Sequence, residues 1–178
     1  FQWLRGLDPN EQEYPNEVKW IRVRRKRKRI LPETLLTRED IERLIKATEN
    51  SRDRAHVLTH YESACRIGEI LSLRIENIHF DRDGAALIVN GKTGTRRVRI
   101  VVAKPALAEW LSMHPNRGDP TSYVWIGIGT VGQYKPLTYE AIRRMYRNLT
   151  KRASLGKRVY THLFRHTRAR ELAKSCLL

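Results

Sequence analysis

The sequence predicts a mainly α-helical fold with a small three-stranded antiparallel β-sheet (an α+β arrangement). Apolar residues recur at helical spacing in several segments on both sides of a β-rich stretch, which runs from Asn77 to Val102. That stretch is divided by Asp83-Gly84 and by the sequence NGKTG, the turn chemistry of two consecutive hairpins. With 178 residues, of which 40% are hydrophobic, the chain is long enough for one well-formed core.

The first predicted helix lies in ILPETLLTREDIERLIKAT. Pro32 interrupts regular structure, and Thr37 with Asp40 three residues later is typical of a helix N-cap and its capping partner. The apolar positions that follow at helical spacing are Ile41, Leu44 and Ile45. We therefore expect one domain at 30–178, preceded at 1–29 by the end of another domain and a basic linker.

Further helices are expected on both sides of the sheet. One spans Ser51 to Ser63, and RIGEILSLRIENI continues as a short helix; the inward residues of the first are Ala55, Leu58 and Thr59. After the sheet, KPALAEWLSMH and LTYEAIRRMYRNLTKRA are helical, the second with an apolar face of Ile142, Met145, Tyr146 and Leu149. A last helix begins near Thr161, and we predict that Tyr160 packs in the interior.

The chain is strongly basic. Lys and Arg number 35 against 19 Asp and Glu, which gives a formal charge of +16 and a pI of about 10.4. This excess favours a polyanionic partner such as nucleic acid over a membrane surface. No stretch approaches the length of apolar sequence that spans a bilayer, so we expect a soluble, intracellular protein. Cys65 and Cys176 match no metal or disulfide pattern and are expected to be free thiols.

A basic run, RVRRKRKR, occupies Arg22 to Arg29 with seven charges in eight residues. Such a run alone is equally typical of a solvated linker or a nuclear import signal. Its position directly before a capped helix favours a connector along a phosphate backbone, where each side chain displaces condensed counterions. The residues of this run that we expect to contact DNA are Arg24, Arg25, Lys26, Arg27 and Lys28.

A pair of histidines flanks an arginine in HLFRH. His162, Arg165 and His166 are spaced i, i+3 and i+4, which places them on one face of a helix. Two histidines four residues apart also resemble half a zinc site. However, Leu163 stands where a zinc protease helix has its glutamate, and no third ligand follows, so we expect no metal.

Two other places carry side chains suited to binding an anion. Arg66 is followed at i+3 by Glu69, which can hold a guanidinium in one orientation. Lys92 lies in the predicted hairpin turn with Thr93 and Arg96 close by, and this tip is a candidate finger for DNA. Any of these residues taken singly is more often ordinary surface charge. The glycines of GIGTVG match a dinucleotide loop only superficially, so we expect no nucleotide cofactor.

The order and combination of these pieces resemble the catalytic domain of the tyrosine recombinase and phage integrase family. The pieces are the arginine in ACRIGEILSLRIENI, the lysine in a β-turn and HLFRHTRA on a late helix. LPETLLTREDIERLI resembles the beginning of the first helix of that domain. FQWLRG and YPNEVKWIRVRRKRKR resemble the join from the family's DNA-clasping N-terminal domain, in a style similar to archaeal integrases. The resemblance covers essentially the whole chain.

The resemblance implies DNA strand transfer without metal or nucleotide. In this family a tyrosine attacks a DNA phosphodiester, a 3′-phosphotyrosyl bond forms, and the released 5′-hydroxyl later attacks a partner strand. Carried over to this sequence, Arg66 and Arg165 would bind the non-bridging oxygens. Lys92 would protonate the leaving 5′-oxygen, His162 would assist proton transfer, and Glu69 would position its neighbours.

The family's nucleophilic tyrosine lies a few tens of residues after the position that Arg165 matches. The sequence ends 13 residues after Arg165, at Leu178, and none of its seven tyrosines occupies the expected place. We expect a trimmed or disordered tail, with a natural truncation as the other explanation. The fragment alone is then expected to bind duplex DNA without forming a covalent adduct.

The expected partners are a double-stranded attachment site and other recombinase protomers in a tetrameric synapse. The expected setting is the cytoplasm of the host of a virus or other mobile element. One alternative is a non-catalytic DNA-binding protein, or a decayed integrase that only recognises its site. Type IB topoisomerases and telomere resolvases share this active-site logic, whereas a metal-dependent nuclease would need clustered carboxylates, which the sequence lacks.

Overall fold

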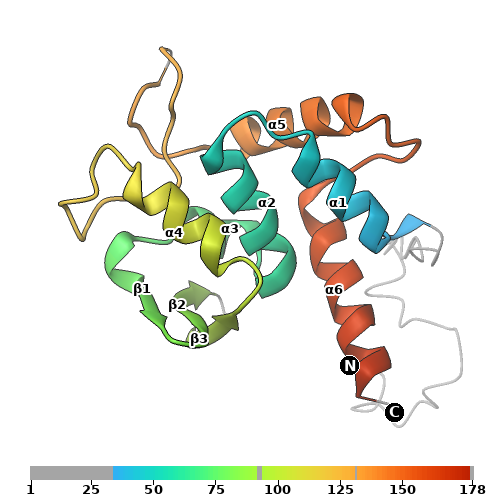
Figure 1. Ribbon diagram of the computed structural model, residues 1–178, viewed down its shortest axis with the longest axis horizontal. Coiled ribbons are helices and arrows are strands. Elements are labelled where there is room, and N and C mark those ends of the chain that lie inside the picture. Colours follow the sequence, from blue (N-terminus) through green and yellow to red (C-terminus); the bar gives the residue numbers. More distant parts are fainter. Residues whose placement is uncertain (1–33, 92–93, 131, 177–178) are drawn as a thin grey trace, which may run out of the picture. The chain divides into compact units, whose positions relative to one another are not determined.

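The computed structural model describes residues 34–91, 94–130 and 132–176, all of which belong to the unit Leu31–Leu178. Helices and one sheet follow each other there in the predicted order (Figure 1). The first elements are α1 (Arg38–Lys46), α2 (Ser51–Ser63), α3 (Ile67–Leu71) and the 3₁₀ helix η3 (Ile75–Asn77). Strands β1 (Ile78–Asp81), β2 (Gly84–Gly91) and β3 (Gly94–Ile100) come next, followed by α4 (Lys104–Ser112), α5 (Tyr139–Arg152) and α6 (Thr161–Ser175). The predicted fold class is confirmed.

Helix α1 begins where the capping pattern predicts. The Thr37 hydroxyl accepts a hydrogen bond from the Asp40 backbone N–H at 3.2 Å, and the Asp40 carboxylate accepts one from the Thr37 N–H at 2.9 Å. This reciprocal arrangement satisfies two N–H groups that the start of a helix leaves without intrahelical partners. Asp40 also forms an ion pair with Lys157 at 2.7 Å, which ties α1 to the segment between α5 and α6.

The sheet has the strand order β1-β2-β3 and is antiparallel throughout. Asp81 closes the first hairpin, because its carboxylate accepts the N–H groups of Asp83 and Gly84, each at 3.0 Å. Side chains alternate along β3, so that Val98 lies on the inner face of the strand and Arg97 on the exposed face. Arg96 has the same parity as Val98 and therefore points toward the inner side.

The described unit has two hydrophobic clusters, which share α2. The first cluster packs the sheet, α3 and α4 around Trp125, and the second packs α1, α5 and α6 around Tyr146 and Phe164. Helix α2 contributes Ala55 to the first cluster and Val57 to the second. This helix is therefore the element against which both halves of the unit are positioned.

The prediction that the side chain packs inward is confirmed for Tyr146, which is buried, and is wrong for Tyr160, which is 37% exposed. Tyr160 is the N-cap of α6 and has an extended backbone. Side chains alternate in extended chain, so Val159 and Thr161 take the inward positions and Tyr160 points to solvent. No helix among the described residues is long and apolar enough to cross a membrane.

Candidate functional site

Arg66 is placed by the sharp turn that ends α2. Ala64, the C-cap of α2, has a φ of 49° and lies in the left-handed region, which reverses the chain direction within one residue. Two residues later Arg66 is the N-cap of α3, with an extended backbone. Arg66 therefore lies at the junction of two helices, with its side chain 43% exposed.

Glu69 holds Arg66 from the first turn of α3. Its carboxylate accepts the backbone N–H of Arg66 at 2.8 Å and the Arg66 Nη1 at 3.1 Å. The predicted pairing of these two residues is confirmed. The Glu69 side chain is only 3% exposed, so a charge has been removed from water and must be compensated by partners.

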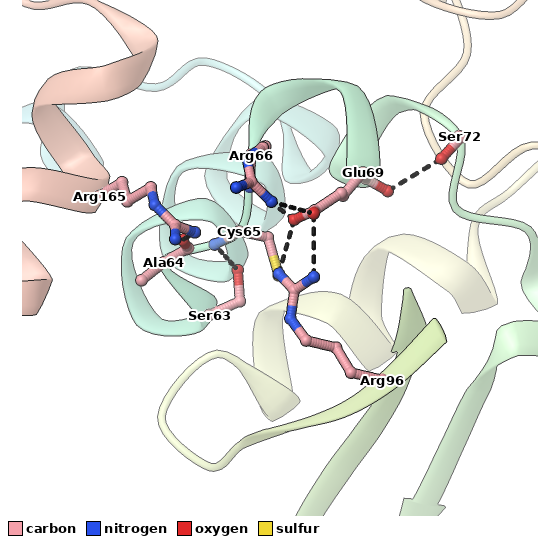
Figure 2. Close-up of polar contacts among 8 residues, drawn as sticks. All are labelled: Ser63, Ala64, Cys65, Arg66, Glu69, Ser72, Arg96 and Arg165. Carbon is pink, nitrogen blue, oxygen red and sulfur yellow. Dashed lines mark hydrogen bonds and ion pairs between the residues drawn. The ribbon is translucent and has the colours of Figure 1, made fainter. Parts of the chain in front are cut away.

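Arg96 of β3 is the main partner of that charge (Figure 2). Its Nη1 donates to Glu69 Oε1 at 2.9 Å and its Nη2 donates to Oε2 at 2.6 Å, a two-pronged ion pair. The Arg96 guanidinium, aided by the backbone and side chain of Arg66, lowers the pKa of Glu69 to about 2, although burial acts in the opposite direction. Glu69 is therefore an anion over the whole physiological range.

Arg165 reaches the same region from α6. The buried side of this helix is formed by Leu163, Phe164 and Thr167, and the Thr167 hydroxyl accepts the N–H of Leu36 at 3.1 Å. That packing leaves Arg165 half-buried, with its Nη1 donating to the carbonyl oxygen of Ala64 at 2.8 Å (Figure 2). The residue that turns the chain toward Arg66 thus also anchors Arg165.

An open pocket of about 310 Å³ lies where these side chains meet. It is lined by Ser63, Ala64, Arg66, Arg96, Arg165, Ala169 and Leu172. A guanidinium has five N–H groups. The guanidinium groups of Arg66 and Arg165 each donate one hydrogen bond to the residues that the structure describes. The pocket can therefore present two forked cations to one anion, a geometry suited to a phosphate.

Among the predicted site residues that the structure describes, His162 is not part of this pocket lining. His162 lies one turn before Arg165 on α6 and is exposed, with its ring centroid 6.4 Å from that of His166. Lys92, Thr93 and the basic run Arg24, Arg25, Lys26, Arg27 and Lys28 lie outside the described residues. Their expected roles stay predictions.

The sequence did not indicate a buried polar cluster formed by His56, His60 and Tyr146. His60 Nδ1 lies 2.7 Å from the Tyr146 hydroxyl, which lies 3.2 Å from His56 Nδ1, and all three side chains are buried. Burial lowers the pKa of His60 to about 3 and holds that of His56 well below its usual value. Within the described ranges no three His, Cys, Asp or Glu side chains are grouped to hold a metal ion.

Comparison with known proteins identifies the family. The model of the phage integrase family matches residues 34–177, and the chain belongs to that family. Transposase A from transposon Tn554 of Staphylococcus aureus is 29% identical over 175 residues, which cover 93% of this chain and 46% of the transposase. Tyrosine recombinase XerA of Pyrococcus furiosus is 30% identical over 142 residues, which cover 77% of this chain and 48% of XerA.

A solved structure agrees with these relatives. The crystal structure of XerA recombinase superposes with a TM-score of 0.67 at 25% identity, covering 79% of this chain and 51% of that one. The chain thus spans about half the length of the curated relatives that it matches.

Proposed function

We propose that this protein is a site-specific DNA recombinase that cleaves and rejoins strands through a 3′-phosphotyrosyl intermediate. The observation that carries the proposal is the meeting of Arg66 and Arg165, 99 residues apart in the sequence, at one pocket. Membership of the phage integrase family supports it, and so does the similarity to a transposase and to a tyrosine recombinase.

The proposed chemistry uses the two arginines as clamps on one scissile phosphate. Attack on a phosphodiester places extra negative charge on the non-bridging oxygens in the transition state. Two fixed guanidinium groups stabilise that charge more strongly there than in the ground state. Glu69 keeps Arg66 in place through the two hydrogen bonds described above. His162 would assist proton transfer, and Lys92 would protonate the leaving 5′-oxygen.

The remaining parts of the proposal concern binding and assembly. Arg24, Arg25, Lys26, Arg27, Lys28 and Thr93 are proposed to contact duplex DNA. The active assembly would be a tetramer of protomers on two attachment sites, and it would work at the nucleoid in the cytoplasm. The relative in transposon Tn554 favours a mobile element as the source, and the XerA relative is compatible with an archaeal host.

The decisive experiment traps the covalent intermediate. The full-length protein is incubated with a duplex site, recovered by selection with the protein, that carries a nick beside the scissile phosphate. We expect an adduct that survives denaturation, and peptide mapping of that adduct identifies the nucleophilic tyrosine. Among the described residues that line the pocket there is no tyrosine, so the mapped position is new information.

Substitutions test the two arginines. Arg66→Ala or Arg165→Ala should slow adduct formation by about 10²–10³-fold, with a much smaller loss of duplex affinity. Arg117→Ala, which removes the same charge from an exposed position, is the matched control and should leave both quantities unchanged. If both pocket variants lose binding and cleavage in step, the assignment is wrong. Specific binding without any adduct would instead identify a non-catalytic DNA-binding protein.

A further inference from the structure

Arg96 donates more hydrogen bonds within the protein than the other two pocket arginines do. It donates from Nη1 to Glu69 Oε1, from Nη2 to Glu69 Oε2, and from Nη2 to the Cys65 sulfur at 3.6 Å. Three of its five N–H groups are therefore committed, whereas the side chains of Arg66 and Arg165 each commit one to described residues. Most of the hydrogen-bonding capacity of Arg96 is therefore satisfied by the protein itself, which is not expected of a residue that binds a ligand.

The backbone of β2 closes the other side of Glu69. A Cβ atom at Gly91 would overlap Glu69 Oε1, so only glycine allows the strand to pass this close to the carboxylate. Gly91 pairs with Gly94 across the second hairpin, and Arg96 follows two residues later on the same strand as Gly94. Glu69 is thus the point at which α3, β2 and β3 meet.

Arg96 also changes the net charge of the cluster that it forms with Arg66 and Glu69. Arg66 and Glu69 alone would form a neutral pair, and the carboxylate would cancel much of the attraction of Arg66 for an anion. With Arg96 present, the three side chains carry a net charge of +1, and the carboxylate charge is shared between two guanidinium groups. Arg66 therefore keeps both its orientation and its attraction for an incoming phosphate.

We propose that Arg96 is a positioning residue, which acts through Glu69 to orient Arg66 and to preserve its charge for the scissile phosphate. This inference deepens the proposed function and rests on it. It also replaces the expectation that Arg96 binds DNA as part of a hairpin finger. A direct phosphate contact would require N–H groups of Arg96 that face the ligand. The two shortest hydrogen bonds of its guanidinium are made to Glu69 instead.

The test is a double-substitution cycle read by phosphate binding. The variants are Arg96→Gln, Glu69→Gln, the double variant, the conservative Arg96→Lys, and Arg97→Gln as the matched control from the exposed face of β3. Inorganic phosphate alone is titrated into each protein, and binding is followed by the side-chain N–H resonances of the arginines. Thermal unfolding of every variant shows that the protein measured is folded.

The two roles of Arg96 predict different patterns. If Arg96 acts through Glu69, Arg96→Gln weakens phosphate binding on the order of tenfold in the parent and less than about twofold when Glu69 is already glutamine. Arg96→Lys recovers most of the affinity, and Arg97→Gln has little effect. Equal losses from Arg96→Gln in both backgrounds would show a direct phosphate ligand and overturn the inference. So would equal losses for the glutamine and lysine variants, which would indicate a structural role only.

A second measurement separates this inference from the proposed function. In the full-length protein, Arg96→Gln should slow adduct formation by about 10²-fold, as expected when a reacting group is misplaced. The salt dependence of its duplex binding should stay close to the parent slope, because Arg96 itself makes no contact with the DNA backbone. An adduct that forms at the parent rate overturns the inference. A parent protein that forms no adduct refutes the proposed function, and the phosphate cycle still decides the role of Arg96.

Discussion

Lowering the pH from 7 to 5 should destabilise the fold by at least about 2 kcal/mol, because His60 is buried in the uncharged form and the buried His56 acts in the same direction. Burial brings the pKa of His60 from 6.5 to about 3, and it holds the pKa of His56 well below 6.5. In the unfolded chain both side chains take up a proton near pH 6.5. Between that pH and the lower folded pKa, the unfolded state therefore binds more protons, and stability falls as the pH falls.

The magnitude follows from this difference. His60 contributes about 1.4 kcal/mol per pH unit between 6.5 and its folded pKa, which amounts to about 2 kcal/mol between pH 7 and pH 5. The lowered pKa of His56 adds to the loss in the same direction. The buried carboxylate of Glu69 adds little in this window, because its stabilisation is lost only below its unfolded pKa of 4.5. A domain of this size is typically stable by roughly 5–15 kcal/mol, so the loss is a large share of the total.

The assay is chemical unfolding at pH 7 and at pH 5, with the free energy extrapolated to zero denaturant. His60→Phe should reduce the difference between the two pH values by about 2 kcal/mol, because one titrating group is gone. Tyr146→Phe is the matched control: it removes the hydroxyl between the histidines, lowers stability at both pH values, and keeps the pH difference. A parent difference below about 1 kcal/mol would refute the reasoning.

Substitutions test three local features of the fold by the same unfolding assay. Thr37→Ala removes the N-cap of α1 and should cost about 1 kcal/mol, so no measurable loss would contradict the capping assignment. Ala64→Gly should be neutral or stabilising by up to about 1 kcal/mol, because the backbone of Ala64 is in the left-handed region. Ala55→Gly, within α2, is the comparison and should cost about 1 kcal/mol or more. Gly91→Ala should cost roughly 1–3 kcal/mol as the new methyl displaces Glu69, and the same loss in a Glu69→Ala background would argue against that contact.

The features that were predictable from the sequence depend on neighbouring residues. The capping pair of Thr37 and Asp40 and the turn at Asp83-Gly84 are each contained within a few positions, and both are found in the structure. The apolar face of α5 is likewise a matter of spacing, and Tyr146 on that face is buried as predicted. In such cases the pattern alone defines the geometry.

The features that were missed depend on pairs of residues far apart in the chain. The sequence places Arg96 near the tip of a basic hairpin, and only the packing of the sheet against α3 brings its side chain to Glu69. His56 and His60 read as polar residues on an unremarkable helix, yet the two hydrophobic clusters enclose them from both sides. Gly91 reads as a turn residue, whereas the structure requires glycine there for a close approach. Sequence patterns carry no signal for such encounters.

The shared position of α2 has a consequence for the spacing of the pocket arginines. Arg96 belongs to a strand that packs in the first cluster, Arg165 belongs to a helix that packs in the second, and Arg66 follows directly after the end of α2. The distance between the guanidinium groups of Arg96 and Arg165 therefore depends on how the sheet and α6 each pack against α2. A bulkier or smaller residue on either side of α2, however far from the phosphate, changes the width of the clamp.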